Sequence, residues 1–302
     1  RRLFVMIYLV GVVVTALLSN DATAVVLTPA VYAGCRAAKV KDPLPYLYIC
    51  AFIANAASFV LPISNPANLV IFAGGEMPPL SRWLGTFLGP SIAAIVVTFI
   101  ALYWSQRRVL ASDTVADKVE RPVLSLPAKL AGVGLLATAA VLISASAMHI
   151  DLGLPTFLAG ALTSIAVLAI MRQSPIEIIK DVSWAVLPLV AGLFVIVEAV
   201  NHTGVTSLIA EHLKAISEHS ETQAIGIGGI SVALFSNLVN NLPAGLFAAS
   251  AVQAAQVSDR VTAAVLIGVD LGPNLSVTGS LATILWLTAL RREGIYVSAL
   301  DF

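Results

Sequence analysis

Charged side chains are scarce in this chain of 302 residues. They make up 11% of it, against roughly 25% in a soluble domain. Hydrophobic residues make up 58% of the chain, and the mean hydropathy is +0.93. So little charge cannot cover a water-facing surface, which excludes an ordinary soluble domain. The 17 basic and 17 acidic residues balance, so the charge gives no sign of a nucleic-acid partner.

Cysteine is also rare, with only Cys35 and Cys50, and the sequence has no CxxC or Cys/His spacing. This pattern predicts neither a disulfide framework nor a zinc site, and we expect no resident metal and no cofactor. The sequence also lacks HExxH, GxGD and a glycine-rich phosphate loop followed by lysine. A membrane metalloprotease, an aspartyl intramembrane protease and an ATPase are therefore not predicted.

Most of the sequence consists of long apolar segments. As helices, such segments can span the hydrocarbon core of a membrane, which is about 30 Å thick. Residues 105–127 form the one substantial polar linker, which separates a first repeat at 1–104 from a second at 128–302. We predict an all-α polytopic membrane protein. Its apolar segments are 3–33, 44–73, 83–104, 129–147, 154–171, 184–200, 224–256 and 261–290.

The same irregular polar pattern interrupts two apolar segments in each repeat. Matching residues are offset by about the same length: Ser236 follows Ser19 by 217 residues, and Thr283 follows Asn68 by 215. Helix breaks and polar side chains are costly in hydrocarbon unless they line a cavity. The pattern predicts discontinuous transmembrane helices and a binding site at the interface of an inverted-repeat transporter.

The distribution of Lys and Arg predicts the orientation. If 184–200 enters the membrane and turns back near residues 201–204 as a re-entrant hairpin, one side carries 13 Lys and Arg and the other 4. Without the hairpin the division is 11 against 6. The positive-inside rule makes the richer side cytoplasmic and favours the hairpin. By the same symmetry we expect two spans and a hairpin before residue 1 and one span after Phe302.

Four stretches around the interruptions resemble arsenite efflux permeases, the ArsB family of the ion-transporter superfamily. They are LSNDATAVVLTPAVYA (18–33), ICAFIANAASFVLPISNPANLVIF (49–72), FSNLVNNLPAG (235–245) and VLIGVDLGPNLSVTGSLATILWL (265–287). The resemblance implies a secondary active transporter in the inner (plasma) membrane that exports arsenite and antimonite by alternating access, driven by the proton-motive force. In some systems such a permease docks a cytoplasmic arsenite-stimulated ATPase.

Arsenous acid is mostly uncharged at neutral pH, and its three hydroxyls both donate and accept hydrogen bonds. Amide and hydroxyl side chains do the same, so we expect the substrate among those of the interruptions. The alternative is that they only satisfy the broken backbone or join helices. The candidates are Asn20, Ser64, Asn65, Asn68, Ser236, Asn237, Asn240, Asn241, Asn274, Thr278, Ser280 and Thr283.

Three carboxylates fall inside the predicted spans or hairpin: Asp21, Asp270 and Glu198. Burial disfavours the charged form of a carboxylate, so such a group can take up and release a proton, as an antiporter requires. We predict these residues as proton-coupling sites. Asp21 could instead cap a broken helix, and Glu198, near the hairpin tip, could be solvated.

Three other kinds of transport stay open. Carboxylates, hydroxyls and broken-helix carbonyls also suit Na⁺, so the alternative is a Na⁺/H⁺ antiporter or a Na⁺-coupled carrier of the same superfamily. A passive channel is a further alternative. A dicarboxylate symporter is less favoured because no basic side chain is predicted at the site, although half-helix N-termini can bind anions. Capture of arsenic by Cys35 and Cys50 is not predicted, since two thiols are too few and we expect them apart.

Overall fold

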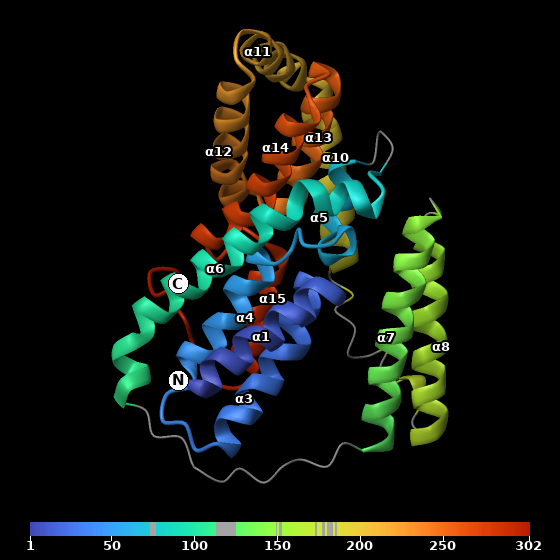
Figure 1. Ribbon diagram of the computed structural model, residues 1–302, viewed down its shortest axis with the longest axis vertical. Helices are drawn as coiled ribbons and strands as arrows, with labels where there is room; N and C mark the ends of the chain where they lie inside the picture. Colours follow the sequence, from blue (N-terminus) through green and yellow to red (C-terminus); the bar gives the residue numbers. More distant parts are fainter. Residues whose placement is uncertain are drawn as a thin grey trace. The chain divides into compact units, whose positions relative to one another are not determined.

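A computed structural model describes most of the chain as helix, and the described part contains no strand (Figure 1). Residues 113–124 of the predicted linker lie outside the described residues. The chain divides into two compact units. The described residues are 1–72, 77–112, 125–148, 150, 153–172, 174–176, 179, 184 and 186–302.

The larger unit begins with a series of broken helices. Proline lies in the first turn of α4 and of α5, where its missing N–H costs nothing and its fixed φ favours helix. In chain order the elements are α1 (Arg2–Leu17), α2 (Asn20–Ala22), a π-helical turn (Thr23–Leu27), α3 (Thr28–Ala37), α4 (Leu44–Ala56), a 3₁₀ turn (Pro62–Ser64), α5 (Pro66–Ile71) and α6 (Leu80–Ser112).

The same unit continues in the second half of the chain. The chain turns at Gly204, whose φ of 82° is a left-handed value, at the position predicted for the hairpin turn. A second break lies at Asn240, whose φ is 80°. The elements are α10 (Val186–His202), α11 (Val205–His219), α12 (Glu221–Val239), α13 (Asn241–Ala255), α14 (Asp259–Leu271), a 3₁₀ turn (Gly272–Leu275) and α15 (Leu281–Arg292).

Helix boundaries repeat between the two halves of the chain. Helices α4 and α14 each have 13 residues, and they begin 215 residues apart, at Leu44 and Asp259. Helices α5 and α15, which follow the two breaks, also begin 215 residues apart, at Pro66 and Leu281. Each polar interruption of the sequence therefore coincides with a helix end.

The broken helices of one half pack against those of the other. Helix α15 contacts α2, the π-helical turn and α4, while α13 contacts α5, and α14 contacts both α4 and α5. Trp286 of α15 is fully buried and donates from Nε1 to the carbonyl oxygen of Leu47 at 2.9 Å. The breaks of the two halves are thus held in one packed region of the larger unit.

Helices α12 and α14 lie side by side at very close range (Figure 1). A Cβ atom on Gly268 would collide with the backbone oxygen of Gly229, and one on Gly272 would collide with that of Ala233. Small residues four apart on facing helices are a common packing device in membranes. This packing fixes the end of α14, where Asp270 lies.

The smaller unit contains α7 (Leu126–Ala147) and α8 (Gly153–Met171), which pack against each other. A Cβ atom on Gly134 would collide with the side chain of Thr163, so glycine permits this approach. By length and composition, four described helices could cross a membrane: α6, most of α7, α8 and α12. Many of their large apolar side chains are exposed, as expected for surfaces that face lipid.

Candidate functional site

Asp270 is the centre of a buried hydrogen-bond group between the two halves. It lies in the last turn of α14 and is completely buried. Ser58 Oγ lies 2.6 Å from its Oδ2, and Asn65 donates from Nδ2 to its Oδ1 at 2.8 Å. Both partners belong to the break between α4 and α5. In the part of the chain that the structure describes, no Lys or Arg forms an ion pair with Asp270.

Asn55 and Asn274 form a second link between the halves, next to this group. Asn55 is fully buried in the last turn of α4 and donates from Nδ2 to Asn274 Oδ1 at 2.9 Å. Asn274 lies in the 3₁₀ turn after α14 and donates to the carbonyl oxygen of Phe52 at 3.4 Å. Each half therefore presents a polar residue at the end of a helix to the break of the other.

The first break is held by its own side chains. Asn65 accepts from the N–H of Ala67 at 3.0 Å and so caps α5. Ser64 Oγ donates to the carbonyl oxygen of Ala16 at 2.8 Å. Asn68 donates from Nδ2 to the carbonyl oxygen of Ser58 at 2.8 Å. All three predicted residues are buried, and much of their hydrogen bonding is to broken backbone, as the alternative reading expects.

The second break contains a matching group. Asn237 donates from Nδ2 to the carbonyl oxygens of Ala233 and Gly272, at 2.7 and 2.8 Å. Ser236 is buried and donates to the same oxygen of Ala233 at 2.9 Å. Asn240 donates to the carbonyl oxygen of Thr278 at 3.2 Å. The Thr278 side chain is exposed and donates to the Asn237 carbonyl oxygen at 3.1 Å.

Three more predicted residues lie around the start of α15. Ser280 caps this helix by accepting from the N–H of Thr283 at 3.0 Å, and the two hydroxyl oxygens are 2.9 Å apart. Both are fully buried. The N–H of Asn241 donates to the carbonyl oxygen of Gly279 at 2.8 Å. These contacts join the start of α13 to the loop that precedes α15.

Asp21 lies in the first turn of α2, where its hydrogen-bonded neighbours differ from those of Asp270. The cap of α2 is Ser19, whose Oγ accepts from the N–H of Ala22 at 3.0 Å. The reading of Asp21 as the cap is therefore wrong. Asn20 accepts from the N–H of Asp21 at 2.8 Å, and nearby the hydroxyls of Thr15 and Thr23 are 2.8 Å apart.

Glu198 is not a hydrogen-bond partner in the Asp270 group; its neighbour is His202. Its side chain is 67% exposed, and its Oε1 lies 3.2 Å from Nε2 of His202, one turn later on α10. Its predicted part in proton coupling thus lacks the buried surroundings of Asp270.

Several buried side-chain oxygens have no hydrogen-bond donor within the described residues. A carboxamide oxygen accepts hydrogen bonds, and a buried acceptor without a donor is unusual. Most of these atoms lie at the helix breaks of both halves. The atoms at the breaks are Oδ1 of Asp21, Asn55, Asn68, Asn237 and Asn241, and one further such atom, Ser91 Oγ, lies within α6.

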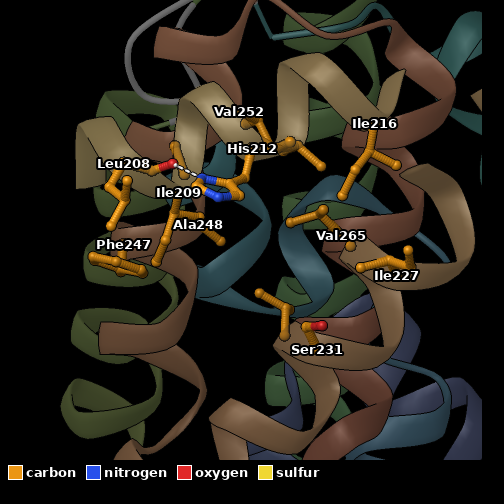
Figure 2. A pocket seen from close by; sticks show the side chains of 14 residues that line it. Leu208, Ile209, His212, Ile216, Ile227, Ser231, Phe247, Ala248, Val252 and Val265 are labelled. Atoms are coloured by element: carbon orange, nitrogen blue, oxygen red, sulfur yellow. Dashed lines mark hydrogen bonds between the residues drawn. The ribbon is translucent and has the colours of Figure 1, made fainter. Parts of the chain in front are cut away.

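An apolar pocket lies elsewhere in the larger unit, between α11, α12, α13 and α14 (Figure 2). Leu208, Phe247 and Val265 are among its lining residues. His212 lies at this pocket with its Nδ1 2.8 Å from the Leu208 carbonyl oxygen. None of the predicted site residues lines it, so the candidate site is the set of polar groups at the breaks.

Sequence reasoning missed Asn55 and Ser58. Asn55 could have been found, because it precedes Asp270 by the repeat offset of 215 residues. Ser58 could not, since nothing in the sequence reveals how the nine residues between α4 and α5 fold. The expectation that Cys35 and Cys50 lie apart is not supported: both are buried in one core cluster, where α3 packs against α4. Among the described residues, no group of three or more His, Cys, Asp or Glu side chains could hold a metal ion.

Comparison with known proteins agrees with the resemblance of the interrupted segments. A family model described as "Citrate transporter" (CitMHS) matches residues 1–271. The arsenical pump membrane protein of Yersinia enterocolitica is 26% identical over 313 residues, and that of Escherichia coli is 25% identical over 310. An uncharacterised transporter of Mycobacterium tuberculosis is 26% identical over 327 residues. Each alignment covers 99–100% of this chain and 72% of the relative.

Proposed function

This chain belongs to the citrate transporter family, and from that premise we propose that it is a secondary active transporter that exports arsenite and antimonite from the cytoplasm in exchange for protons. The family and the relatives support a multi-pass membrane transporter and not a catalytic enzyme. We further propose that the substrate is the metalloid, that it is exchanged for protons, and that transport is by alternating access in the inner membrane. A cytoplasmic arsenite-stimulated ATPase is a proposed partner on the resemblance alone.

The substrate fits the polar groups of the breaks. Neutral arsenous acid carries three O–H donors, and the buried oxygens of Asn55, Asn68 and Asn237 are acceptors that lack a donor among the described residues. Amide N–H groups in the same breaks can donate to the arsenic hydroxyl oxygens. A neutral trihydroxide also needs no countercharge from the protein.

Citrate is the second candidate, because the family model carries that description. Citrate is anionic at neutral pH, and an anion beside the Asp270 carboxylate would be repelled unless a cation lay between them. Within the described residues, the side chains that bond to Asp270 are Ser58 and Asn65, both uncharged. This surrounding favours the neutral metalloid over the anion.

One observation carries the proton coupling: the Asp270 carboxyl is fully buried between the two halves, and among the described residues it receives hydrogen bonds only from uncharged side chains of the opposite half. A movement of one half against the other would change those partners, and with them the balance between the charged and neutral carboxyl. Alternating access in inverted repeats is a movement of this kind. The re-entrant hairpin near Gly204 and the inverted orientation of the halves are parts of the same proposal.

The test uses everted membrane vesicles that contain the full-length protein, in which export is measured as arsenite uptake. Uptake is followed with an imposed pH gradient, with and without Na⁺, and after an uncoupler has collapsed the gradient. The proposal requires uptake that does not depend on Na⁺ and is lost with the uncoupler. Uptake that survives the uncoupler would indicate a channel. Citrate uptake, or Na⁺-dependent proton movement without arsenite uptake, would favour the citrate carrier or the sodium antiporter.

Three carboxamide variants then separate the candidate carboxylates. Asp21→Asn and Asp270→Asn are expected to lower pH-driven uptake by at least about 100-fold, the usual effect of removing a group that transfers a proton. Glu198→Gln tests the third candidate, whose side chain is exposed beside His202. Glu218→Gln, an exposed carboxylate on α11, is the matched control. Full pH-driven uptake by both Asp variants would contradict the assignment.

A further inference from the structure

Ser58 holds a position that none of the sequence patterns indicated. It is completely buried in the break after α4. Its Oγ lies 2.6 Å from Asp270 Oδ2 and 2.7 Å from the carbonyl oxygen of Asn55. A serine hydroxyl has one proton and two lone pairs, so it donates to one of these oxygens at a time. Two hydrogen-bond arrangements are therefore open to the same set of heavy atoms.

In the first arrangement the Asp270 carboxyl is ionised. The Ser58 hydroxyl donates to Oδ2, and Asn65 donates to Oδ1 at 2.8 Å. In the second, a proton is bound to Oδ2. That carboxyl O–H donates to Ser58 Oγ, and the Ser58 proton turns to the Asn55 carbonyl oxygen. The proton comes from a hydronium ion on the side of the membrane to which the site is open. One O–H bond of that ion breaks as the O–H bond on Asp270 forms, and the Ser58 hydroxyl keeps its own proton throughout.

We infer that Ser58 is a positioning residue for proton exchange, which rotates its hydroxyl between Asp270 and the Asn55 carbonyl oxygen so that Asp270 can gain or lose a proton while buried. The inference deepens the proposed function and rests on it. Buried polar groups are stable when every donor has an acceptor, and both arrangements meet this condition for the hydroxyl and the carboxyl.

The rotation also connects Asp270 to the candidate substrate residues. The carbonyl oxygen that accepts the Ser58 hydrogen bond belongs to Asn55, whose side chain donates to Asn274 of the opposite half at 2.9 Å. The Ser58 carbonyl oxygen accepts from Asn68 at 2.8 Å. A change at the carboxyl is therefore passed to amides of both breaks through two contacts.

No other titratable side chain competes for Asp270 among the described residues. Helix α14 packs against α4, α5, α12, α13 and the 3₁₀ turn that follows it. Of these elements, α5, α13 and the turn carry no titratable side chain.

The other two helices carry titratable side chains that bond elsewhere. Glu221 of α12 bonds to Ser258 and Arg260 at the opposite end of α14, and Tyr48 of α4 donates to the Asp301 carbonyl oxygen. The remaining titratable residues are Tyr46 and Cys50 on α4 and Asp259 on α14, and none of them is a hydrogen-bond partner of Asp270.

Two transport assays on one variant test the inference. In arsenite exchange, labelled arsenite on one side replaces unlabelled arsenite on the other without a pH gradient, and no proton needs to be released. Ser58→Ala is expected to lower pH-driven uptake about tenfold, the effect of one lost hydrogen bond to a charged group. Its exchange rate is expected to stay within about twofold of the unaltered protein, since the substrate-loaded transporter still moves.

The control is Ser91→Ala, because Ser91 is also fully buried but its hydroxyl has no partner among the described residues. It is expected to leave both assays unchanged. Loss of driven uptake and exchange to the same extent in Ser58→Ala would indicate a merely structural role and overturn the inference. Normal driven uptake would overturn it as well. If the unaltered protein shows no pH-driven uptake at all, the proposed function fails instead.

If Ser58→Ala transports too little to measure, infrared difference spectra of the purified protein test the inference, because they report the hydrogen bonding of the protonated Asp270 carboxyl. Protonation of Asp270 gives a carboxyl C=O band that is absent in Asp270→Asn. In Ser58→Ala this band is expected to move to higher frequency, because the carboxyl O–H has lost its acceptor. An unmoved band would show that Ser58 does not bond the protonated carboxyl.

Discussion

Asn55 and Asp270 occupy the same place in the two halves of the molecule, 215 residues apart, and each bonds to the break of the opposite half. Asn55 reaches Asn274 at 2.9 Å, and Asp270 lies 2.6 Å from Ser58 Oγ. Both residues are in the last turn of 13-residue helices. The amide cannot carry charge, whereas the carboxyl can. At this sequence offset, one helix therefore ends with a neutral side chain and the other with an ionisable one.

Because of this difference, Asn55→Ala and Asp270→Asn are expected to fail in opposite ways. Asn55→Ala removes the donor to Asn274, so the KM for arsenite should rise about tenfold, as for the loss of one or two hydrogen bonds. Its uptake should still follow the pH gradient. Asp270→Asn should keep arsenite exchange and lose the response to the gradient. The measurement is uptake against arsenite concentration at several imposed gradients, and identical behaviour of the two variants would contradict the division of roles.

The sequence predicted the breaks well, because their residues have strong local preferences. Pro62, Pro66 and Pro273 cannot continue a helix from the preceding turn, and the helices end or begin beside them. Of the candidate amides at those breaks, Asn20, Asn65, Asn68 and Asn241 are buried, whereas Asn237, Asn240 and Asn274 are partly exposed. The partners of Asp270 were harder to predict, because Ser58 and Asn65 meet it through packing between segments more than 200 residues apart. Periodicity contains no information on such contacts.

Gly268 is expected to be essential for the packing of α14 against α12. A Cβ atom there would meet the backbone oxygen of Gly229, which cannot turn aside. Gly268→Ala should therefore lower the free energy of unfolding by roughly 1–3 kcal/mol, the usual cost of overpacking. Gly226→Ala on α12 is the control, because its Cβ would meet nothing within 4 Å, and alanine favours helix by about 1 kcal/mol over glycine. Thermal unfolding in detergent measures both, and equal melting temperatures would refute the close approach.

The two thiols are expected to be dispensable for transport. Cys35 and Cys50 are buried among apolar side chains of α1, α3 and α4, whereas the groups around Asp270 come from the helix breaks. The double variant Cys35→Ala/Cys50→Ala should retain pH-driven arsenite uptake within about twofold, while the two small cavities lower stability by about 1–2 kcal/mol. A thiol reagent should then have no effect on its uptake. Loss of uptake with normal folding would instead assign arsenic binding to the thiols.

The sequence alone left two alternative roles for Asp21, helix capping and proton coupling. In the structure, Ser19 is the cap. Ser19 caps α2 through a 3.0 Å bond from the N–H of Ala22, whereas Oδ1 of Asp21 is buried and has no donor among the described residues. Ser19→Ala is therefore expected to cost about 1 kcal/mol of stability, as for other caps, and to leave pH-driven uptake in place. Asp21→Asn should do the reverse, because it keeps the size of the side chain and removes the proton-binding group. Melting temperature and driven uptake are measured on both variants. If instead Asp21→Asn melted early and still followed the pH gradient, Asp21 would be a structural residue of the first break, and proton coupling would rest on Asp270 without it.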